Sequence, residues 1–342
     1  MNNSEFSSLN LSSALQDNLA SLGYLQMTPI QAQSLPLVLD GKDLIAKAKT
    51  GSGKTAAFGL GLLAKLDVNR LAVQALVLCP TRELADQVAT EIRRLARTLP
   101  NVKLVTLCGG TPTAPQSATL GFGAHIAVGT PGRILKHLEQ GTLALDDLKT
   151  LVLDEADRML DMGFGEDINR VISHAPQDRQ TLLFSATYPE GIAQMSRGVQ
   201  RNPVEVSVES LHEESAIEQK LYEVPAGQRL DALTWLLSHY QPSSCVVFCN
   251  TKRACNDVAD HLAAKGFSAL ALNGDLEQRE RDQVLVRFAN GSATILVATD
   301  VAARGLDIKE LGAVINYELT YDPEVHVHRI GRTGRAGQQG LA

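Results

Sequence analysis

The alternation of short apolar runs with longer amphipathic stretches constrains the fold of this chain more than any other feature of its sequence. Continuous Val, Leu and Ile runs such as residues 75–79 are typical of strands buried on both faces of a parallel sheet. Between these runs lie stretches with apolar residues at helical spacing, of which residues 82–99 are the clearest. The pattern predicts an α/β fold of doubly wound parallel sheets, with ligand sites at the carboxyl ends of the strands.

The alternation occurs twice along the 342 residues. The first series of predicted strands is 44–48, 75–79, 103–107, 125–128, 151–153 and 181–184, and the second is 220–224, 246–248, 269–272, 295–298 and 313–317. Between the two series, residues 209–215 are polar and acidic without hydrophobic periodicity. We therefore expect a first domain over 1–208, a linker over 209–215 and a second domain over 216–342.

Composition limits the class of protein. The 32 basic and 38 acidic side chains give a net charge of −6, which argues against a polybasic protein but not against a local basic groove for nucleic acid. No apolar run is long enough to span a bilayer, and the first residues lack the pattern of a signal peptide, so a cytoplasmic location is expected. The five cysteines form no C-x-x-C pair, and His326 with His328 lacks a third metal ligand, so neither disulfides nor structural zinc are expected.

A glycine-rich loop follows the first predicted strand and precedes a helix. Residues 48–55 read Ala-Lys-Thr-Gly-Ser-Gly-Lys-Thr, a phosphate-binding pattern in which Ala48 replaces the usual first glycine. Glycines let backbone N–H groups surround phosphates, Lys54 would reach the β and γ phosphates, and the Thr55 hydroxyl would ligate Mg²⁺. The residues expected to bind nucleotide here are Thr50, Gly51, Ser52, Gly53, Lys54 and Thr55.

Two adjacent carboxylates end a later strand. In residues 150–157, Thr-Leu-Val-Leu-Asp-Glu-Ala-Asp, the strand delivers Asp154 and Glu155 to its carboxyl end. Asp154 would hold Mg²⁺ through water, and Glu155 would orient and deprotonate the attacking water. With the phosphate loop upstream, these residues predict hydrolysis of a nucleoside triphosphate.

At Asp154-Glu155-Ala156-Asp157 the chain resembles the DEAD-box RNA helicases, and motifs resembling that family follow in order along the whole chain. The resemblance implies two tandem RecA-like domains joined by a short flexible linker, ATP and Mg²⁺ as cofactors, RNA as partner and a monomeric core. It also implies that Gln31 hydrogen-bonds the adenine edge and that Phe6 stacks on the ring. Met27 stands where the family usually has proline.

The resemblance implies contacts with the RNA backbone from both domains. Thr81 and Thr130 each precede a predicted helix, Thr130 with Pro131 at the first helical position, so both are expected to be N-cap residues. Helix N-termini bind phosphate without reading bases. The expected RNA-binding residues are Pro80, Thr81, Arg82, Gly110, Thr130, Arg133, Asn250, Thr251, Gly274, Gln278, Arg281, Thr299 and Arg304.

The second domain has no phosphate loop, and the resemblance gives it a complementary role. Arg332 and Arg335 would reach across the cleft to the γ-phosphate as catalytic residues, Asp307 would bind the ribose, and Gly305 would approach the attacking water. The residues expected to couple hydrolysis to strand separation are Asp157, Ser185, Thr187 and His328. Because one active site is then split between two domains, hydrolysis is expected to depend on RNA.

Residues 273–293 and 322–335 resemble most a bacterial subgroup that acts on ribosomal RNA during assembly of the large ribosomal subunit. Members of this subgroup carry an RNA-binding domain after the core, so we expect this chain to be truncated before that domain. The leading expectation is an RNA helicase that unwinds short duplexes with RNA-stimulated ATPase activity. An ATP-gated RNA clamp and a DNA translocase remain alternatives.

Overall fold

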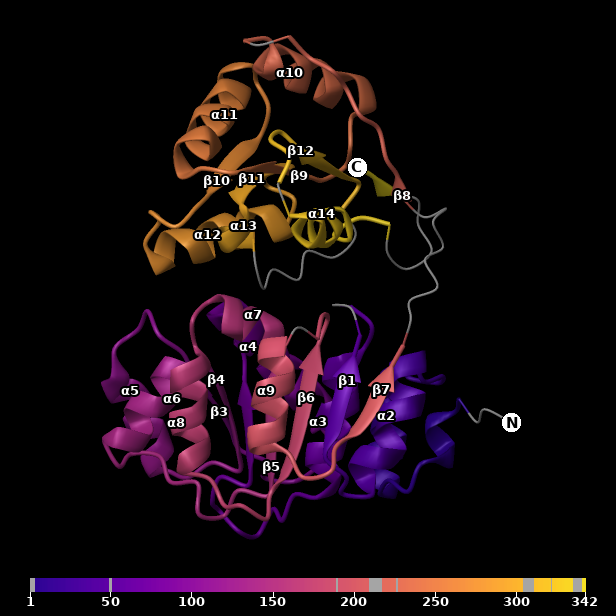
Figure 1. The fold of residues 1–342 in the computed structure, drawn as a ribbon, viewed down its shortest axis with the longest axis vertical. Helices are drawn as coiled ribbons and strands as arrows, with labels where there is room; N and C mark the ends of the chain where they lie inside the picture. The colour runs from indigo at the N-terminus through magenta and orange to yellow at the C-terminus, as the bar shows by residue number, and fades with distance from the viewer. Residues whose placement is uncertain are drawn as a thin grey trace. The chain divides into compact units, whose positions relative to one another are not determined.

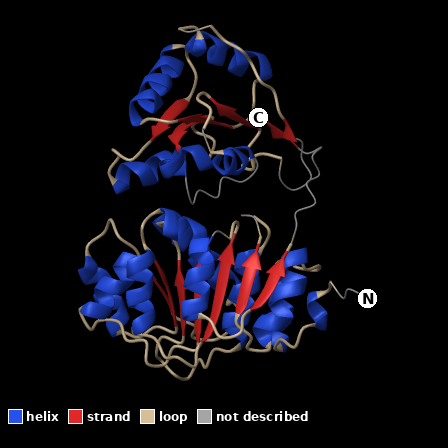
Figure 2. Cartoon of the chain, in the orientation of Figure 1, coloured by secondary structure: helices blue, strands red, loops and turns tan. Residues whose placement is uncertain are grey.

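The computed structural model describes residues 4–48, 51–188, 190–208, 217–225, 227–303, 311–320, 322–334 and 340–342. The chain divides into two compact units, Met1–Ser210 and Leu211–Ala342. Figure 1 shows the elements of each unit, and Figure 2 shows that helices cover both faces of each sheet. The expected class, two doubly wound α/β domains, is confirmed.

The first unit is built on a seven-stranded parallel sheet in the order β3-β4-β2-β5-β6-β1-β7. Its strands are β1 (Leu44–Lys47), β2 (Ala75–Leu78), β3 (Leu104–Leu107), β4 (Ile126–Gly129), β5 (Thr150–Asp154), β6 (Gln180–Ser185) and β7 (Val204–Ser207). Because all the pairings are parallel, the carboxyl ends of these strands lie along one edge of the sheet.

Helices pack on both faces of this sheet and bury its apolar side chains. The helical elements are η1 (Phe6–Ser8), α1 (Ser13–Ser21), α2 (Pro29–Leu39), α3 (Lys54–Ala64), α4 (Arg82–Leu95), α5 (Thr113–Gly121), α6 (Pro131–Glu139), α7 (Ala156–Asp161), α8 (Gly165–Ser173) and α9 (Glu190–Val199). Alternate residues of β2 face opposite cores: Val77 packs with α1–α4, whereas Leu76 and Leu78 pack with α6–α9. Burial on both faces explains why the strands are continuously apolar in sequence.

The second unit repeats this architecture on a six-stranded parallel sheet in the order β10-β11-β9-β12-β13-β8. Its strands are β8 (Ile217–Glu218), β9 (Cys245–Cys249), β10 (Ala269–Leu272), β11 (Ile295–Thr299), β12 (Ala313–Asn316) and β13 (Gly340–Leu341). Its helices are α10 (Arg229–Tyr240), α11 (Lys252–Ala264), α12 (Gln278–Ala289), α13 (Asp300–Ala303) and α14 (Pro323–Ile330). Val247 of β9 packs with α10 and α11, and Phe248 with α12 and α13.

One strand expectation was wrong, and β7 and the two-residue strands β8 and β13 were not among the predicted strands. Residues 220–224 form no strand, because only Ile217–Glu218 pairs with the two-residue strand β13, and Leu221 and Tyr222 are left 78% and 43% exposed. Strand β7 was missed because it is a short edge strand with alternating polar residues, paired on one side with β1. The expected linker 209–215 lies outside the described residues.

All five cysteines are free and buried; four lie in or beside strands, as expected, and Cys255 lies in α11. Burial raises the pKa of the Cys245 thiol to about 12. In the part of the chain that the structure describes, no helix combines the length and apolar character that a membrane span requires.

Candidate active site

The phosphate loop lies between β1 and α3, at the carboxyl edge of the first sheet, where β1 is the strand beside the edge strand β7. Gly51 and Gly53 have φ of 83° and 92°, and a Cβ on Gly53 would lie 2.5 Å from Gln31 Nε2, so this backbone needs glycine. Lys54 is 6% exposed, and its Nζ donates to the Ala48 carbonyl at 2.9 Å. The loop is thus folded around its own lysine at the N-terminus of an eleven-residue helix, an arrangement suited to phosphate.

Two residues of the preceding segment hold this loop in place. The Thr28 hydroxyl donates to the Ser52 carbonyl at 2.8 Å, and Gln31 Nε2 donates to the Gly53 carbonyl at 3.0 Å. Gln31 Oε1 accepts from the Thr28 amide at 2.9 Å. An amide has two N–H donors and an acceptor oxygen with two lone pairs, so one donor and one lone pair of Gln31 are not used by these contacts. The structure therefore gives Gln31 a role in supporting the loop that the sequence did not indicate.

Phe6, expected to stack on adenine, lies in the core of the first unit. Its side chain is 3% exposed and meets the Tyr24 ring edge-on, with 5.9 Å between centroids. The contact with adenine stays a prediction.

Asp154 ends β5, the central strand of the first sheet. Among the described residues its Oδ1 has no hydrogen-bond partner although it is buried. Burial raises its pKa to about 6, opposed by Lys54 and aided by Glu155 and Asp157. A buried carboxylate oxygen without a partner fits a cation ligand, and Thr55 offers a hydroxyl in the first turn of α3, directly after the phosphate loop. These two residues fit a Mg²⁺ that takes its other ligands from phosphate and water.

Glu155 occupies an unusual backbone conformation directly after β5. Its φ of 53° lies in the left-handed region, and its side chain is 4% exposed. Arg158 Nη1 donates to Glu155 Oε2 at 2.7 Å in a buried ion pair. Arg158 was not singled out from the sequence, although its i, i+3 spacing from Glu155 is a signal that could have found it.

Asp157 links the strand-end carboxylates to the segment after β6. Its Oδ2 accepts from the Thr187 amide and hydroxyl, both at 2.9 Å, and its amide donates to Ser185 Oγ at 3.4 Å. Burial acts to raise the pKa of Asp157, but the hydrogen bonds from Thr187, Ser185 and Arg158 lower it below the usual value. The contact between these two motifs is present, whereas their coupling role stays a prediction.

The expected RNA-binding residues of the first unit follow three adjacent strands. Pro80–Arg82 follow β2, Gly110 follows β3, and Thr130 follows β4, and these strands are neighbours in the sheet. Thr81 caps α4 by accepting from the Leu84 amide at 3.3 Å. Thr130 is the N-cap residue of α6 with Pro131 behind it, but no side-chain capping bond forms there among the described residues. The structure therefore brings these residues to one sheet edge.

Arg82 and Arg133 make contacts within the protein. Arg82 Nε lies 3.6 Å from Asp86 Oδ2, one turn along α4. Arg133 donates to Gln116 Oε1 at 2.9 Å and to the Thr111 carbonyl at 2.7 Å. Arg133 is therefore oriented before any ligand binds.

The expected RNA-binding residues of the second unit also follow strands. Asn250 and Thr251 follow β9, Gly274 follows β10, and Thr299 ends β11. Thr251 caps α11 by accepting from the Ala254 amide at 3.1 Å. In α12, Gln278 donates to Asp282 at 2.9 Å and Arg281 donates to the Ala302 carbonyl.

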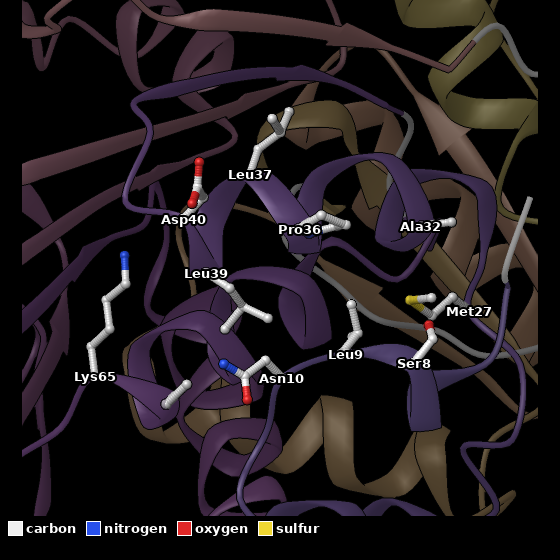
Figure 3. A pocket seen from close by; sticks show the side chains of 11 residues that line it. Ser8, Leu9, Asn10, Met27, Ala32, Pro36, Leu37, Leu39, Asp40 and Lys65 are labelled. Carbon is white, nitrogen blue, oxygen red and sulfur yellow. The ribbon is translucent and has the colours of Figure 1, made fainter.

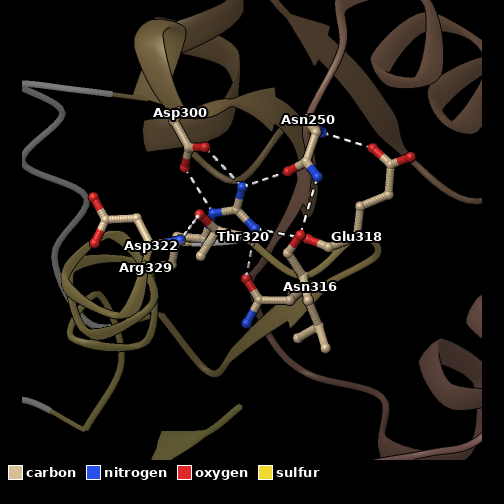
Figure 4. A network of polar contacts seen from close by, with 8 residues as sticks. Asn250, Asp300, Asn316, Glu318, Thr320, Asp322 and Arg329 are labelled. Carbon is tan, nitrogen blue, oxygen red and sulfur yellow. Dashed lines mark hydrogen bonds and ion pairs between the residues drawn. The ribbon is translucent and has the colours of Figure 1, made fainter.

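Arg329 is a buried residue to which the sequence gave no role. Figure 4 shows its guanidinium at the centre of a polar network. It donates to both Asp300 oxygens at 2.7 Å, to Asn250 Oδ1 at 2.9 Å, to Asn316 Oδ1 at 3.1 Å and to the Glu318 carbonyl at 2.7 Å. These five bonds use all five guanidinium donors, and the Phe248 ring lies 5.1 Å away. Arg329 thus ties α14 to the ends of β9, β11 and β12.

The remaining predicted site residues lie in α14, just after it, or outside the described residues. Arg332 is 7% exposed, two residues beyond the end of α14. His328 lies in α14, but its side chain is not described. Five predicted site residues lie outside the described residues: Thr50, Arg304, Gly305, Asp307 and Arg335.

A hollow of about 820 Å³ in the first unit lies beside α2, on a different face of this helix from Gln31 (Figure 3). Ala32 and Pro36 line it, whereas Gln31 contacts the phosphate loop. Its lysine, Lys65, donates to the Val38 carbonyl and to Gln180, both at 2.6 Å, and burial lowers its pKa. The phosphate-binding chemistry is therefore at the loop and not in this hollow.

Comparison with known families and proteins identifies the class of this chain. The model of the DEAD/DEAH box helicase domain matches residues 28–195, and that of the helicase conserved C-terminal domain matches residues 228–337. The chain belongs to the DEAD-box family of ATP-dependent RNA helicases.

Individual relatives make the likeness more specific. The chain is 63% identical over 338 residues to the ATP-dependent RNA helicase DbpA of Escherichia coli, covering 98% of this chain and 74% of DbpA. It is 45% identical to the DEAD-box ATP-dependent RNA helicase CshA of Geobacillus kaustophilus, covering 98% of this chain and 72% of CshA. The expected likeness to the subgroup that contains DbpA is thereby confirmed.

Solved structures extend the likeness to the fold. S. cerevisiae Dbp5 bound to RNA and ADP BeF3 matches with a TM-score of 0.89 at 31% identity, over 99% of this chain and 88% of that chain. A DEAD box protein from Methanococcus jannaschii matches with a TM-score of 0.59 at 41% identity, over 99% of this chain and 92% of that chain.

Proposed function

We propose that this chain couples RNA-stimulated ATP hydrolysis to the separation of short RNA duplexes. The observation that carries the proposal is the placement of Asp154 and Glu155 on the same sheet edge as the phosphate loop, with Asp154 Oδ1 buried and without a partner among the described residues. That arrangement supplies a nucleotide cradle, a cation ligand and a second carboxylate for the attacking water in one place.

The proposed roles follow from the side-chain chemistry. Lys54 neutralises the β and γ phosphates, and Thr55 and Asp154 hold Mg²⁺, which when bound offsets phosphate charge. Glu155 accepts the proton of the attacking water, while Arg158 fixes the position of its carboxylate at 2.7 Å. From the second unit, Arg332 and Arg335 stabilise the charge that develops on the γ-phosphate.

RNA is proposed to bind through its backbone at the strand-end residues of both units. Threonine hydroxyls, arginines and helix N-termini suit phosphate and sugar, which carry no sequence information. The RNA acted on in the cell is proposed to be ribosomal RNA of the large subunit, on the basis of the 63% identity to DbpA.

A strand-displacement assay tests the proposed unwinding. A short RNA duplex carrying a fluorophore and a quencher is incubated with the chain and Mg²⁺, with ATP or with a non-hydrolysable analogue. We expect strand separation with ATP and none without nucleotide. RNA binding and ATP hydrolysis without strand separation would replace the proposal with an ATP-gated clamp.

The ribosomal role has its own test. In cells from which the gene is deleted, sucrose-gradient profiles are expected to show precursors of the large subunit accumulating. Restoration by the wild-type gene but not by Glu155→Gln would support a role for hydrolysis. A normal profile would contradict the ribosomal proposal while leaving the enzymatic one intact.

A further inference from the structure

One side-chain amide in the first unit connects two segments that carry expected RNA-binding residues. Gln116 lies in α5, and its Nε2 donates to the Cys108 carbonyl and to Thr111 Oγ1, both at 3.0 Å. Its Oε1 accepts from Arg133 Nη1 at 2.9 Å and lies 3.0 Å from His137 Nε2. Both ends of the amide are therefore used, one on the loop after β3 and the other on α6.

Arg133 closes this connection into a ring. Besides Gln116, it donates through Nη2 to the Thr111 carbonyl at 2.7 Å. The bonded loop contains Gly109 and Gly110, and Gly110 is exposed with φ of 77°. The backbone of this loop is thus held at both of its ends, at the Cys108 carbonyl by Gln116 and at the Thr111 carbonyl by Arg133.

Arg133 determines which way the Gln116 amide points, because a guanidinium only donates and therefore faces Oε1, which the His137 ring also meets. The ring is fully buried, and its Nδ1 lies 2.8 Å from the Thr142 hydroxyl. Because the Gln116 oxygen cannot donate, the hydrogen in its contact with the ring is carried by His137 Nε2. With Oε1 fixed toward α6, only Nε2 is directed at the loop.

Packing alone does not account for Gln116. None of the residues of α5 is fully buried, so this helix contributes little to the core. A solvent-facing helix could keep any polar residue here, whereas this one makes four polar contacts with two other segments. The contacts are suited to fixing a surface geometry.

We propose that Gln116 is a positioning residue for RNA binding: it fixes the Gly109–Gly110 loop against the first turn of α6, so that Gly110, Thr130 and Arg133 present one rigid surface to the RNA backbone. This inference rests on the proposed RNA contacts of these three residues. A preformed surface loses less conformational freedom on binding, so removing the amide weakens RNA binding without removing a direct contact.

The test measures the dissociation constant of a fluorescein-labelled single-stranded RNA, by anisotropy, in the presence of Mg²⁺ and a non-hydrolysable ATP analogue. Gln116→Ala is expected to raise this constant by about fivefold to tenfold, as for the loss of a partly buried hydrogen-bond network. The matched control is Gln140→Ala, at the exposed glutamine that ends α6. Affinity for the ATP analogue without RNA reports whether the first unit remains folded.

A double variant separates positioning from an independent contact. If Gln116 acts partly through Arg133, Gln116→Ala combined with Arg133→Ala raises the dissociation constant by less than the product of the two single effects. An unchanged dissociation constant for Gln116→Ala would overturn the proposal. So would a double variant whose increase in the dissociation constant equals the product of the two single increases.

Gln116→Glu serves if the alanine variant does not fold. The carboxylate keeps acceptors for Arg133 and His137 but cannot donate to the Cys108 carbonyl, so RNA binding is still expected to weaken by several-fold. Wild-type RNA affinity in this variant would also overturn the proposal. Because the readout is binding, a failure of RNA-stimulated hydrolysis in the wild type would be distinguished from a failure of this inference.

Discussion

Glu155 shows how the backbone at the end of β5 serves chemistry at the residue scale. A left-handed φ of 53° at a non-glycine residue costs roughly 1–3 kcal/mol, which the surrounding structure must offset. The buried Arg158 pair and the Asp157 hydrogen bonds supply contacts that depend on this turn. This conformation ends the strand at Asp154 and places Glu155 directly beside it.

Replacing Glu155 with Gln is expected to leave ATP binding intact and to lower the rate of phosphate release by about 10²–10⁴, the contribution of a general base. Binding persists because the phosphate loop and Asp154 are unchanged. Phosphate release at saturating RNA measures the effect, with the exposed Glu166→Gln in α8 as the matched control. Turnover near the wild-type rate would remove Glu155 from the mechanism.

Gln31 combines loop support with the expected recognition of adenine. Gln31→Ala is expected to raise the dissociation constant of ATP by about tenfold, and that of GTP by less, because the bonds to Gly53 serve both nucleotides while a base-edge contact serves one. Titration with fluorescent ATP and GTP analogues measures both constants, and the exposed Gln33→Ala in α2 is the control. An unchanged ratio of the two constants would mean that adenine is read elsewhere.

At the scale of elements, periodicity predicted most strands because burial on both faces leaves a continuous apolar run. It failed where sheets end: β7 alternates polar and apolar residues, and residues 220–224, Lys-Leu-Tyr-Glu-Val, are largely unpaired. The phosphate loop and the residues 154–157 were predictable because their chemistry demands fixed residue types at fixed spacing. Arg158, Gln116 and Arg329 were not, because their importance lies in contacts that only the folded chain creates.

Arg329 is the clearest such contact, since it joins three strand ends to α14. Arg329→Met is expected to destabilise the second unit by about 3–5 kcal/mol, because Asp300 and the polar groups around it lose their charged partner. Urea unfolding of the full chain measures the change, with Arg253→Met, whose side chain is 92% exposed, as control. Equal midpoints for these two variants would contradict the assigned role of Arg329.

The network around α6 predicts a dependence of stability on pH. Burial lowers the pKa of His137 below its usual 6.5, and Arg133 and Lys136 add to this effect. Below pH 6.5 the unfolded chain therefore binds a proton that the folded chain resists, so this contribution to stability falls as pH falls. The excess in free energy of unfolding of wild type over His137→Gln is expected to shrink from pH 7.5 to 5.5. A constant or growing excess would contradict the assignment.

At the scale of the whole molecule, the proposed chemistry is divided between two units built on the same architecture. The first carries the phosphate loop and the carboxylates, and the second carries the arginines and further strand-end residues. With a net charge of −6, long-range attraction to RNA is weak, so binding depends on local contacts that added salt disrupts. Because the proposed catalytic residues belong to two units, we expect hydrolysis to depend on RNA.

The most direct test of that claim is the steady-state rate of ATP hydrolysis with saturating single-stranded RNA, with DNA of equal length and sequence, and with no nucleic acid. We expect RNA to raise the rate by about tenfold or more, because charge stabilisation by the second unit's arginines is then added to the first unit's site. We expect no such increase with DNA. Hydrolysis at the same rate without RNA, or equal stimulation by DNA, would contradict it.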